Sequence, residues 1–335
     1  MRRRTLTILP SLILLSIIGG LIFLSQLQPV GNPLQRQVLE ISDGASFSEV
    51  ARMLHQRHLI KSDWAFTWMG RIVGADRNII PGEYEFQGGM TPADILHKIT
   101  SGAVIQYAVT IPEGYSIEQI AGLLEEKGLA DRETFVQLTR DPRFLAQFDP
   151  QLRDLEGYLF PDTYHFTRHM RPDTIIQSMV SRFKQAWTPQ LQARAEELGM
   201  SIHQIVTLAS VIEKETGLSQ ERGLISGVFH NRLRKKIPLQ SDPTVIYALN
   251  HFDGNLRKKD LAVESPYNTY RVRGLPPGPI ANPGEASIRA ALYPIPTNYL
   301  YFVSRNDGSH QFSATLAEHN LAVKKYQLQQ QRRSS

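Results

Sequence analysis

The stretch LEISDGASFSEVARMLHQRHLI at residues 39–60 recurs as VTIPEGYSIEQIAGLLEEKGLA at residues 109–130. Each copy predicts a short strand, a glycine turn, a serine N-cap and an amphipathic helix. The shared positions are mostly apolar or turn residues, which specify a fold rather than a ligand contact. They are Ile41, Gly44, Ser46, Val50, Ala51, Leu54 and Leu59 in the first copy, and Ile111, Gly114, Ser116, Ile120, Ala121, Leu124 and Leu129 in the second.

A further match follows each copy. Residues Pro81, Tyr84, Phe86, Met90, Pro92 and Ile95 recur as Pro161, Tyr164, Phe166, Met170, Pro172 and Ile175. Thr91 before Pro92 is typical of an N-cap followed by proline at the first helical position. The larger offset of this match indicates an insertion within 130–155. Residues 39–180 are therefore predicted to be two copies of a small α+β unit, and the sequence leaves open whether this module binds glycan or serves the fold alone.

The remainder of the chain is predicted to be mainly helical. Ser201 has capping-box spacing with Gln204, apolar residues then recur at helical spacing, and Gly217 is the expected C-cap. We expect further helices over 219–234 and 315–330, with a hairpin around 306–308 between them.

The N-terminus predicts a membrane anchor. Three arginines precede an uncharged, mostly apolar run over 6–24. At about 1.5 Å per residue this run nearly spans a hydrocarbon core of roughly 30 Å, and the arginines predict a cytoplasmic N-terminus. The alternative is a cleaved signal peptide, but the residues that follow make a poor cleavage site.

Composition excludes several classes of protein. The 335 residues are 41% hydrophobic and 21% charged, which is ordinary for a globular chain and excludes collagen-like, disordered and polytopic membrane proteins. The absence of cysteine excludes disulfides, thiolate catalysis and cysteine-ligated zinc. The histidines lack metal-site spacing, so no metal or cofactor is predicted, and His319-Asn320 is interpreted as surface or structural. The net charge of +5 is mild, and a chain exposed outside the cytoplasm would not meet nucleic acid.

Two features could carry chemistry. Glu213 and Glu215 lie near the end of the apolar helix and fall on opposite edges of its apolar stripe, so helical geometry alone does not choose between them. A carboxyl at the rim of an apolar surface has a raised pKa and could act as a general acid on a glycosidic oxygen. The loop 264–284 is rich in proline and glycine, and its residues Tyr267, Asn268 and Tyr270 are of the kind that hold sugars.

Several ordered stretches resemble one family. They are LEGYLFPDTY (155–164), ASVIEKET (209–216), VFHNRL (228–233), LQSDPTVIY (239–247), YNTY (267–270) and GLPPGPI (274–280). In this order they resemble the endolytic murein transglycosylases, single-pass inner-membrane enzymes of bacteria. Ser241 and Pro279 depart from the expected pattern.

The resemblance implies both an organisation and a reaction. The organisation is a cytoplasmic N-terminus (1–5), a transmembrane helix (6–25), a linker (26–38), a LysM-like α+β module (39–107), a related α+β unit (108–180) and a mainly helical catalytic domain related to lytic transglycosylases (181–330), with the bulk in the periplasm. The reaction is cleavage of the β-1,4 bond between N-acetylmuramic acid and N-acetylglucosamine in nascent strands, which leaves 1,6-anhydro ends and limits strand length.

The resemblance also assigns residues and partners. It implies Glu215 as the catalytic residue, with no second carboxylate and no cofactor. The residues expected to bind sugar are Gln240, Asp242, Tyr267, Asn268, Asn231 and Glu156. The partners expected are peptidoglycan glycan strands, the inner membrane and peptidoglycan synthases.

Two alternatives stay open on sequence alone. A glycoside hydrolase would use Glu215 as acid with Asp242 or Glu156 as base or nucleophile. An anchored peptidoglycan-binding scaffold would depend on the duplicated module and make no use of Glu215.

Overall fold

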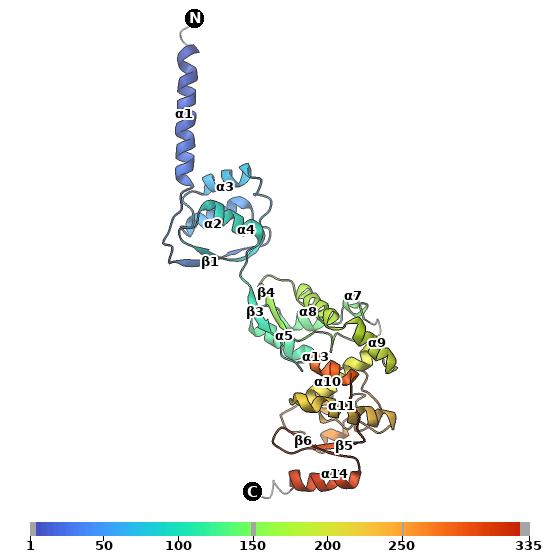
Figure 1. The fold of residues 1–335 in the computed structure, drawn as a ribbon. Coiled ribbons are helices and arrows are strands. Elements are labelled where there is room, and N and C mark those ends of the chain that lie inside the picture. Colours follow the sequence, from blue (N-terminus) through green and yellow to red (C-terminus); the bar gives the residue numbers. More distant parts are fainter. Residues whose placement is uncertain (1–4, 149–151, 250, 329–335) are drawn as a thin grey trace. The chain divides into compact units, whose positions relative to one another are not determined.

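The structure is a computed structural model that describes residues 5–148, 152–249 and 251–328. The chain forms two compact units, one made of residues 1–108 and 165–170 and the other of residues 109–164 and 171–335. Both units combine helices with small antiparallel sheets, a mixed α+β architecture (Figure 1). The domain boundaries expected at 107/108 and 180/181 stay predictions.

The elements of the first unit are α1 (Thr5–Gln26), β1 (Arg36–Ile41), α2 (Phe47–Gln56), α3 (Asp63–Ile72), β2 (Gly82–Gln87) and α4 (Pro92–Ser101). β1 and β2 pair antiparallel, with Leu39 opposite Tyr84. The core of the unit is formed by apolar side chains from β1, β2, α2, α3 and α4. A small sheet with helices packed on it thus gives this unit a core of its own.

The elements that follow are β3 (Tyr107–Thr110), α5 (Ile117–Glu126), α6 (Arg132–Leu138), α7 (Pro142–Leu145), β4 (Thr163–Phe166), α8 (Pro172–Ala186), α9 (Pro189–Glu197), α10 (Ile202–Glu215), α11 (Ser219–Arg234), α12 (Asp242–Ala248), the short 3₁₀ helix η1 (Asp260–Ala262), α13 (Glu285–Leu292), β5 (Tyr301–Ser304), β6 (His310–Ser313), α14 (Leu316–Val323) and the π-helical η2 (Lys324–Leu328). β3 pairs with β4, and β5 with β6. The helix predicted over 219–234 and the hairpin around 306–308 are confirmed.

The repeat predicted from sequence is visible in local geometry. Ser46 and Ser116 cap α2 and α5 through complete capping boxes. The preceding glycines, Gly44 and Gly114, have φ values of 77° and 76°, a conformation that glycine adopts without steric cost. Thr91 caps α4 with proline at the next position, as the sequence indicates. Turn and cap chemistry therefore repeats at α2 and α5, whereas Arg171, the counterpart of Thr91, makes no side-chain cap on α8.

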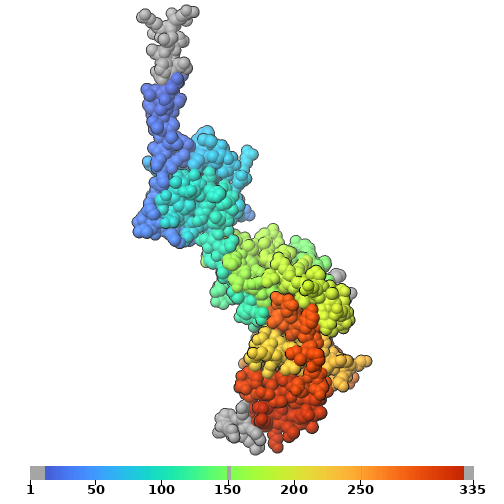
Figure 2. Space-filling model, in the orientation of Figure 1, coloured from blue at the N-terminus to red at the C-terminus, as the bar shows by residue number. Residues whose placement is uncertain are grey.

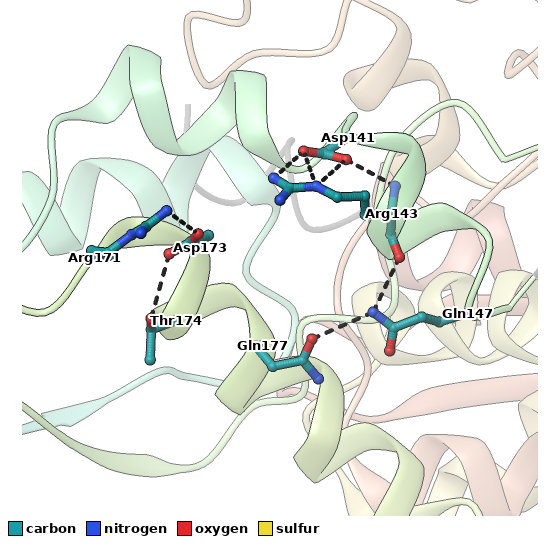
Figure 3. Close-up of polar contacts among 7 residues, drawn as sticks. All are labelled: Asp141, Arg143, Gln147, Arg171, Asp173, Thr174 and Gln177. Carbon is teal, nitrogen blue, oxygen red and sulfur yellow. Dashed lines mark hydrogen bonds and ion pairs between the residues drawn. The ribbon is translucent and has the colours of Figure 1, made fainter.

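α7 lies within 130–155, where the sequence predicts an insertion, and Gln147 just after α7 makes an exposed polar contact with α8 (Figure 3). Asp141 caps α7 by accepting from the backbone N of Arg143 at 2.8 Å. Gln147 Nε2 donates to the carbonyl of Arg143 at 3.3 Å and to Gln177 Oε1 on α8 at 3.4 Å. Exposed polar pairs of this kind add little stability, so we assign them to orienting α7 rather than to holding the unit together.

The predicted transmembrane anchor over 6–25 is wrong. Within the described part of the chain, no helix is long and apolar enough to cross a membrane. The segment does form the helix α1, whose side chains are described from residue 12 to residue 26. The expected fold class is corrected in this respect, as are the inner-membrane location and the inner membrane as a partner. Residues 1–4 of the predicted cytoplasmic segment lie outside the described residues.

α10 is the central helix of the second unit, because it packs against α9, α11, α12 and α13. Every residue from Ile205 to Ile212 on it is buried. Gly157, in the stretch 155–164, lies close against this helix. A Cβ atom built on Gly157 would be 2.7 Å from Val206 Cγ1 and 2.5 Å from Pro279 Cγ, and the φ of Gly157 is +89°. The close packing of this stretch on α10 thus requires a glycine.

We predict that Gly157→Ala destabilises the protein far more than Gly199→Ala does. Both glycines have positive φ, but a Cβ at Gly199 would meet nothing within 4 Å. The control should cost about 1 kcal/mol in free energy of unfolding, from backbone strain alone. Gly157→Ala should cost roughly 1–3 kcal/mol more because of overpacking. Urea denaturation of the two variants measures the difference, and equal losses would contradict the packing argument.

Candidate functional site

The site begins at the end of α10. Ser201 and Gln204 form a complete capping box at the start of the helix, as predicted. The helix ends at Glu215 because Thr216 adopts an extended conformation, with φ −147° and ψ 136°. The Oγ1 atom of Thr216 accepts from the backbone N of Leu218 at 3.0 Å, which stabilises the turn away from the helix. The predicted C-cap at Gly217 is therefore wrong, and Glu215 is the last helical residue.

The structure separates the two carboxylates that helical geometry could not. Glu213 Oε1 accepts from Arg222 Nη2 at 3.2 Å and Oε2 accepts from the backbone N of Gly284 at 2.9 Å. Its side chain is only 6% exposed. Glu215, in contrast, lines a cavity of about 520 Å³. One carboxylate is thus engaged on both oxygens by protein groups, and the other faces an open volume.

The cavity is lined by segments far apart in the sequence. Besides Glu215 it is lined by Arg232, Leu239, Gln240, Asp242, Tyr270, Tyr301, Phe302, Val303, Ser304, His310, Leu316, His319, Asn320, Val323 and Gln327. Of the residues expected to bind sugar, Gln240 and Asp242 lie here beside Glu215. Tyr270, also singled out in the sequence, donates from its hydroxyl to Asp242 Oδ1 at 2.5 Å.

A buried network of hydroxyl groups holds the partner of Glu215. Ser241 Oγ donates to Glu215 Oε1. The backbone N of Ser241 donates to Thr269 Oγ1 at 3.0 Å, and Thr244 Oγ1 donates to the carbonyl of Ser241 at 2.7 Å. The neighbouring Gln240 has a φ of 51°, which is uncommon for a residue other than glycine. The loop before α12 is thus fixed in a strained form that brings Ser241 to the carboxylate.

The environment of Glu215 favours its neutral form near neutral pH. Burial raises the pKa of Glu215 to about 7, and the negative charge of Asp242 adds to this effect. The hydrogen bond from Ser241 and the positive charge of Arg232 oppose the rise in pKa. Such a carboxyl is partly protonated at neutral pH and can both give and take a proton.

The remaining predicted site residues do not line this cavity. Asn231 is buried and donates to the carbonyls of Thr297 and Tyr299 at 2.8 and 2.9 Å. Asn268 is fully buried and donates to the carbonyls of Leu261 and Val263 at 3.0 and 2.8 Å. Each amide ties loop backbone together, which is a structural contact.

Tyr267 and Glu156 lie in another polar cluster of the same unit. The ring of Tyr267 lies 4.9 Å from that of Tyr247 between centroids. Glu156 is buried and accepts from Ile117 N at 3.1 Å, from Asn282 Nδ2 at 2.9 Å and from the Tyr247 hydroxyl at 3.3 Å. The placement of Glu156 gives it no direct contact with the cavity of Glu215.

Sequence analysis missed much of the cavity wall. Tyr301 lies on β5, and its ring stacks on that of His319 with centroids 5.2 Å apart. The guanidinium of Arg232 lies 5.2 Å from the Tyr301 centroid. His319, which the sequence predicts to be surface or structural, lines the cavity. Arg232 is part of the motif VFHNRL (228–233). For the hairpin and α14, the sequence predicts secondary structure but no chemical role.

Within the described residues, no group of three or more histidine, aspartate or glutamate side chains is arranged to hold a metal ion. The chemistry of the cavity is therefore considered below through its carboxyl, hydroxyl and aromatic groups.

Comparisons with known proteins bear on most of the chain. A model of the YceG-like family matches residues 39–325. The endolytic murein transglycosylase of Bacillus subtilis (strain 168) is 36% identical over 331 residues, which cover 92% of this chain and 91% of that protein. The endolytic murein transglycosylase of Streptococcus pneumoniae serotype 2 (strain D39) is 28% identical, over 79% of this chain and 53% of that protein. A 2.6 Å crystal structure of a yceG-like protein from Listeria monocytogenes is similar with a TM-score of 0.61 and 34% identity, covering 86% of this chain and 99% of that one.

The buried carboxyl of Glu156 predicts a pH-dependent stability. Burial, aided by the charge of Asp154, raises the pKa of Glu156 from 4.5 to about 8. Between these values the folded protein binds a proton that the unfolded chain has released, so the free energy of unfolding falls as pH rises. Glu156→Gln should reduce this fall between about pH 5 and pH 8, as measured by urea denaturation across the range.

Glu215 contributes a fall in the same direction, so some slope should remain in Glu156→Gln. The control is Glu264→Gln, whose side chain is 87% exposed, and it should keep the wild-type slope. An unchanged slope in Glu156→Gln would show that Glu156 is ionised in the folded protein throughout this range.

Proposed function

The chain belongs to the YceG-like family, and we propose that it is an endolytic murein transglycosylase, a lyase that acts on peptidoglycan glycan strands. The reaction cleaves the β-1,4 bond between N-acetylmuramic acid and N-acetylglucosamine and leaves a 1,6-anhydro end. One observation carries this proposal: Glu215 lines the cavity, and the pKa of its carboxyl is raised to about 7. The relatives named endolytic murein transglycosylase are consistent with it.

Glu215 would serve as both acid and base. In its neutral form it protonates the oxygen that bridges the two sugars, and the bond from that oxygen to C1 breaks. The carboxylate so formed then takes the proton of the muramic C6 hydroxyl, whose oxygen attacks C1. The acetamido group stabilises the positive charge that develops at C1. The carboxyl ends protonated as it began, and no water is consumed.

Gln240, Asp242 and Tyr270 are proposed to bind the sugar next to the scissile bond. All three line the cavity with Glu215. The side chain of Gln240 is exposed there. The hydroxyl of Tyr270 bonds to Asp242, which leaves the tyrosine ring as a surface for stacking. Tyr267, Asn268, Asn231 and Glu156 lie outside this cavity, so we do not place them at the scissile bond.

A glycoside hydrolase is the second candidate, because Asp242 shares the cavity with Glu215 and could act as base or nucleophile. The two reactions differ in the fate of water. Digestion of sacculi in H₂¹⁸O distinguishes them by mass spectrometry: a hydrolase leaves labelled reducing ends, and a transglycosylase leaves unlabelled anhydro ends. We expect unlabelled anhydro ends.

We predict that Glu215→Gln loses activity while the fold is kept. Glutamine keeps the shape of the side chain but cannot donate and recover a proton. Positioned acid–base catalysis contributes about 10²–10⁴-fold, and with both roles on one residue the loss should lie near the upper end. Release of anhydro-ended fragments from sacculi measures the rate, and thermal unfolding checks the fold.

Glu213→Gln is the matched control on the same helix. It weakens the contact with Arg222, whose side chain is 13% exposed, so it should lower thermal stability while most activity remains. An active Glu215→Gln beside an inactive Glu213→Gln would mean that the wrong carboxyl is assigned. Full activity in both would remove catalysis from this helix and favour a binding scaffold.

We also propose that residues 39–107 bind the glycan strand. It stays a prediction that these residues form a LysM-like module. It also stays a prediction that the protein has a peptidoglycan synthase as a partner. The first unit contains a cavity of about 530 Å³. It is lined largely by polar side chains: Ser42, Asp43, Ser46, Ser48, Thr67, Arg71, Asp76 and Arg77. Hydroxyl, carboxylate and guanidinium groups supply the donors and acceptors that sugar hydroxyls and acetamido groups need.

We predict that the double variant Asp76→Ala/Arg77→Ala weakens binding to sacculi. Each lost hydrogen bond should reduce affinity by roughly 3- to 10-fold. A pull-down with insoluble sacculi, in the Glu215→Gln background to prevent cleavage, measures the bound fraction. Arg52→Ala is the control, because Arg52 is exposed and does not line the cavity. If the double variant binds as its parent does, the module serves the fold and not the glycan.

A further inference from the structure

The wall of the Glu215 cavity formed by β5 and α14 contains an imidazole with unused hydrogen-bonding capacity. α14 packs on β5 and β6. These elements, coloured red, form one end of the second unit (Figures 1 and 2). His319, on α14, lines the cavity. Its Nδ1 atom is buried and has no hydrogen-bond partner among the described residues.

This property sets His319 apart within the cavity. Four other buried side-chain atoms in the described part of the chain lack a partner: Arg222 Nε, Ser226 Oγ, Ser287 Oγ and Arg305 Nε. None of these residues lines the Glu215 cavity. In the cavity wall, the imidazole of His319 therefore has a ring nitrogen, Nδ1, that no described protein group bonds to.

The surroundings of the ring decide where its proton lies. Burial and the charge of Arg232 hold the pKa of His319 below its ordinary value, so the ring is neutral at neutral pH and carries one N–H. A proton on Nδ1 would be a buried donor without an acceptor, which proteins avoid more strictly than an unused lone pair. The proton is therefore assigned to Nε2. That atom is not buried and has no partner among the described residues, so it presents a donor at the cavity surface.

The ring is also held in a fixed orientation. It stacks on Tyr301 with 22° between the planes, and Tyr301 in turn lies over the guanidinium of Arg232. Arg232 is anchored by its Nη1, which donates to the carbonyl of Leu239 at 2.8 Å. A flat aromatic surface beside an N–H donor suits a pyranose, whose C–H face packs on rings and whose oxygens accept hydrogen bonds.

We propose that His319 is a substrate-binding residue of the Glu215 cavity, whose Nε2–H donates to a hydroxyl or acetamido oxygen of a bound sugar while its ring, backed by Tyr301, packs against that sugar. This inference rests on the proposed function, because it takes the glycan strand as the ligand. It assigns α14 to the wall that holds the strand, and it leaves the proton transfers to Glu215.

The test separates the donor from the ring. His319→Phe keeps a flat ring on Tyr301 and removes both nitrogens. The amide nitrogen of His319→Gln reaches the position of Nε2, whereas that of His319→Asn reaches only the position of Nδ1. Leu321→Ala is the control on the same helix, with a side chain 70% exposed and outside this cavity. Calorimetry in the Glu215→Gln background measures Kd for peptide-free glycan chains, and the same substitutions in the active enzyme give KM and kcat.

We expect His319→Phe to raise Kd and KM by roughly 3- to 10-fold, the value of one hydrogen bond, with kcat within about twofold. His319→Gln should recover much of the affinity, His319→Asn should not, and Leu321→Ala should bind as its parent. A Kd within twofold for His319→Phe, in a protein whose wild type binds and cleaves glycan, would overturn this inference alone.

If His319→Phe does not fold, the comparison of Gln with Asn decides, and equal affinities overturn the inference. If the wild type neither binds nor cleaves glycan, the proposed function fails, and the assignment of His319 fails with it.

Discussion

The burial of α10 is the constraint on which the second unit depends. Eight consecutive residues of this helix are buried, which requires protein on all of its sides. Two glutamates follow the buried stretch: the side chain of Glu213 is only 6% exposed, and Glu215 is half-buried at the cavity. A carboxyl in such a place must be paired or become neutral. Glu213 takes the first course, through Arg222 and the backbone of Gly284, and Glu215 takes the second.

The two courses explain why one helix holds a charge-paired carboxylate and a carboxyl with a raised pKa two residues apart. The segment after the helix makes the difference. Thr216 turns the chain into an extended conformation at once, so Glu215 meets the loop before α12 rather than another helical turn. That loop offers a hydroxyl, from Ser241, in place of a cation. A hydroxyl orients a carboxyl without fixing its charge, which a proton-transfer group requires.

Sequence analysis predicted what short-range periodicity and cap chemistry determine. The N-caps at Ser46 and Ser116, the capping box at Ser201, the helix over 219–234 and the hairpin follow from residues a few positions apart. The cavity could not be predicted in the same way, since its walls come from segments joined only by tertiary packing. The motifs containing Asn231 and Asn268 are visible in the sequence, but nothing in them shows that both amides bond to backbone carbonyls. The length and apolar character of the run over 6–24 predict a membrane span, yet no helix in the described part of the chain meets the requirement for one.

The position of Arg232 decides whether Glu215 can act as an acid. A guanidinium paired directly with Glu215 would hold the carboxyl ionised, because an adjacent opposite charge lowers its pKa by one unit or more. The structure directs the donors of Arg232 elsewhere. Its Nε donates to the carbonyl of Leu300 at 2.6 Å, and its Nη1 donates to the carbonyls of Pro238 and Leu239. The cation therefore lies in the cavity wall, where it supports Tyr301, and lowers the pKa of Glu215 less than burial raises it. Because these carbonyl groups hold Arg232 in the cavity wall, its guanidinium does not force the carboxyl of Glu215 to ionise. The proton of Glu215 therefore stays available for transfer.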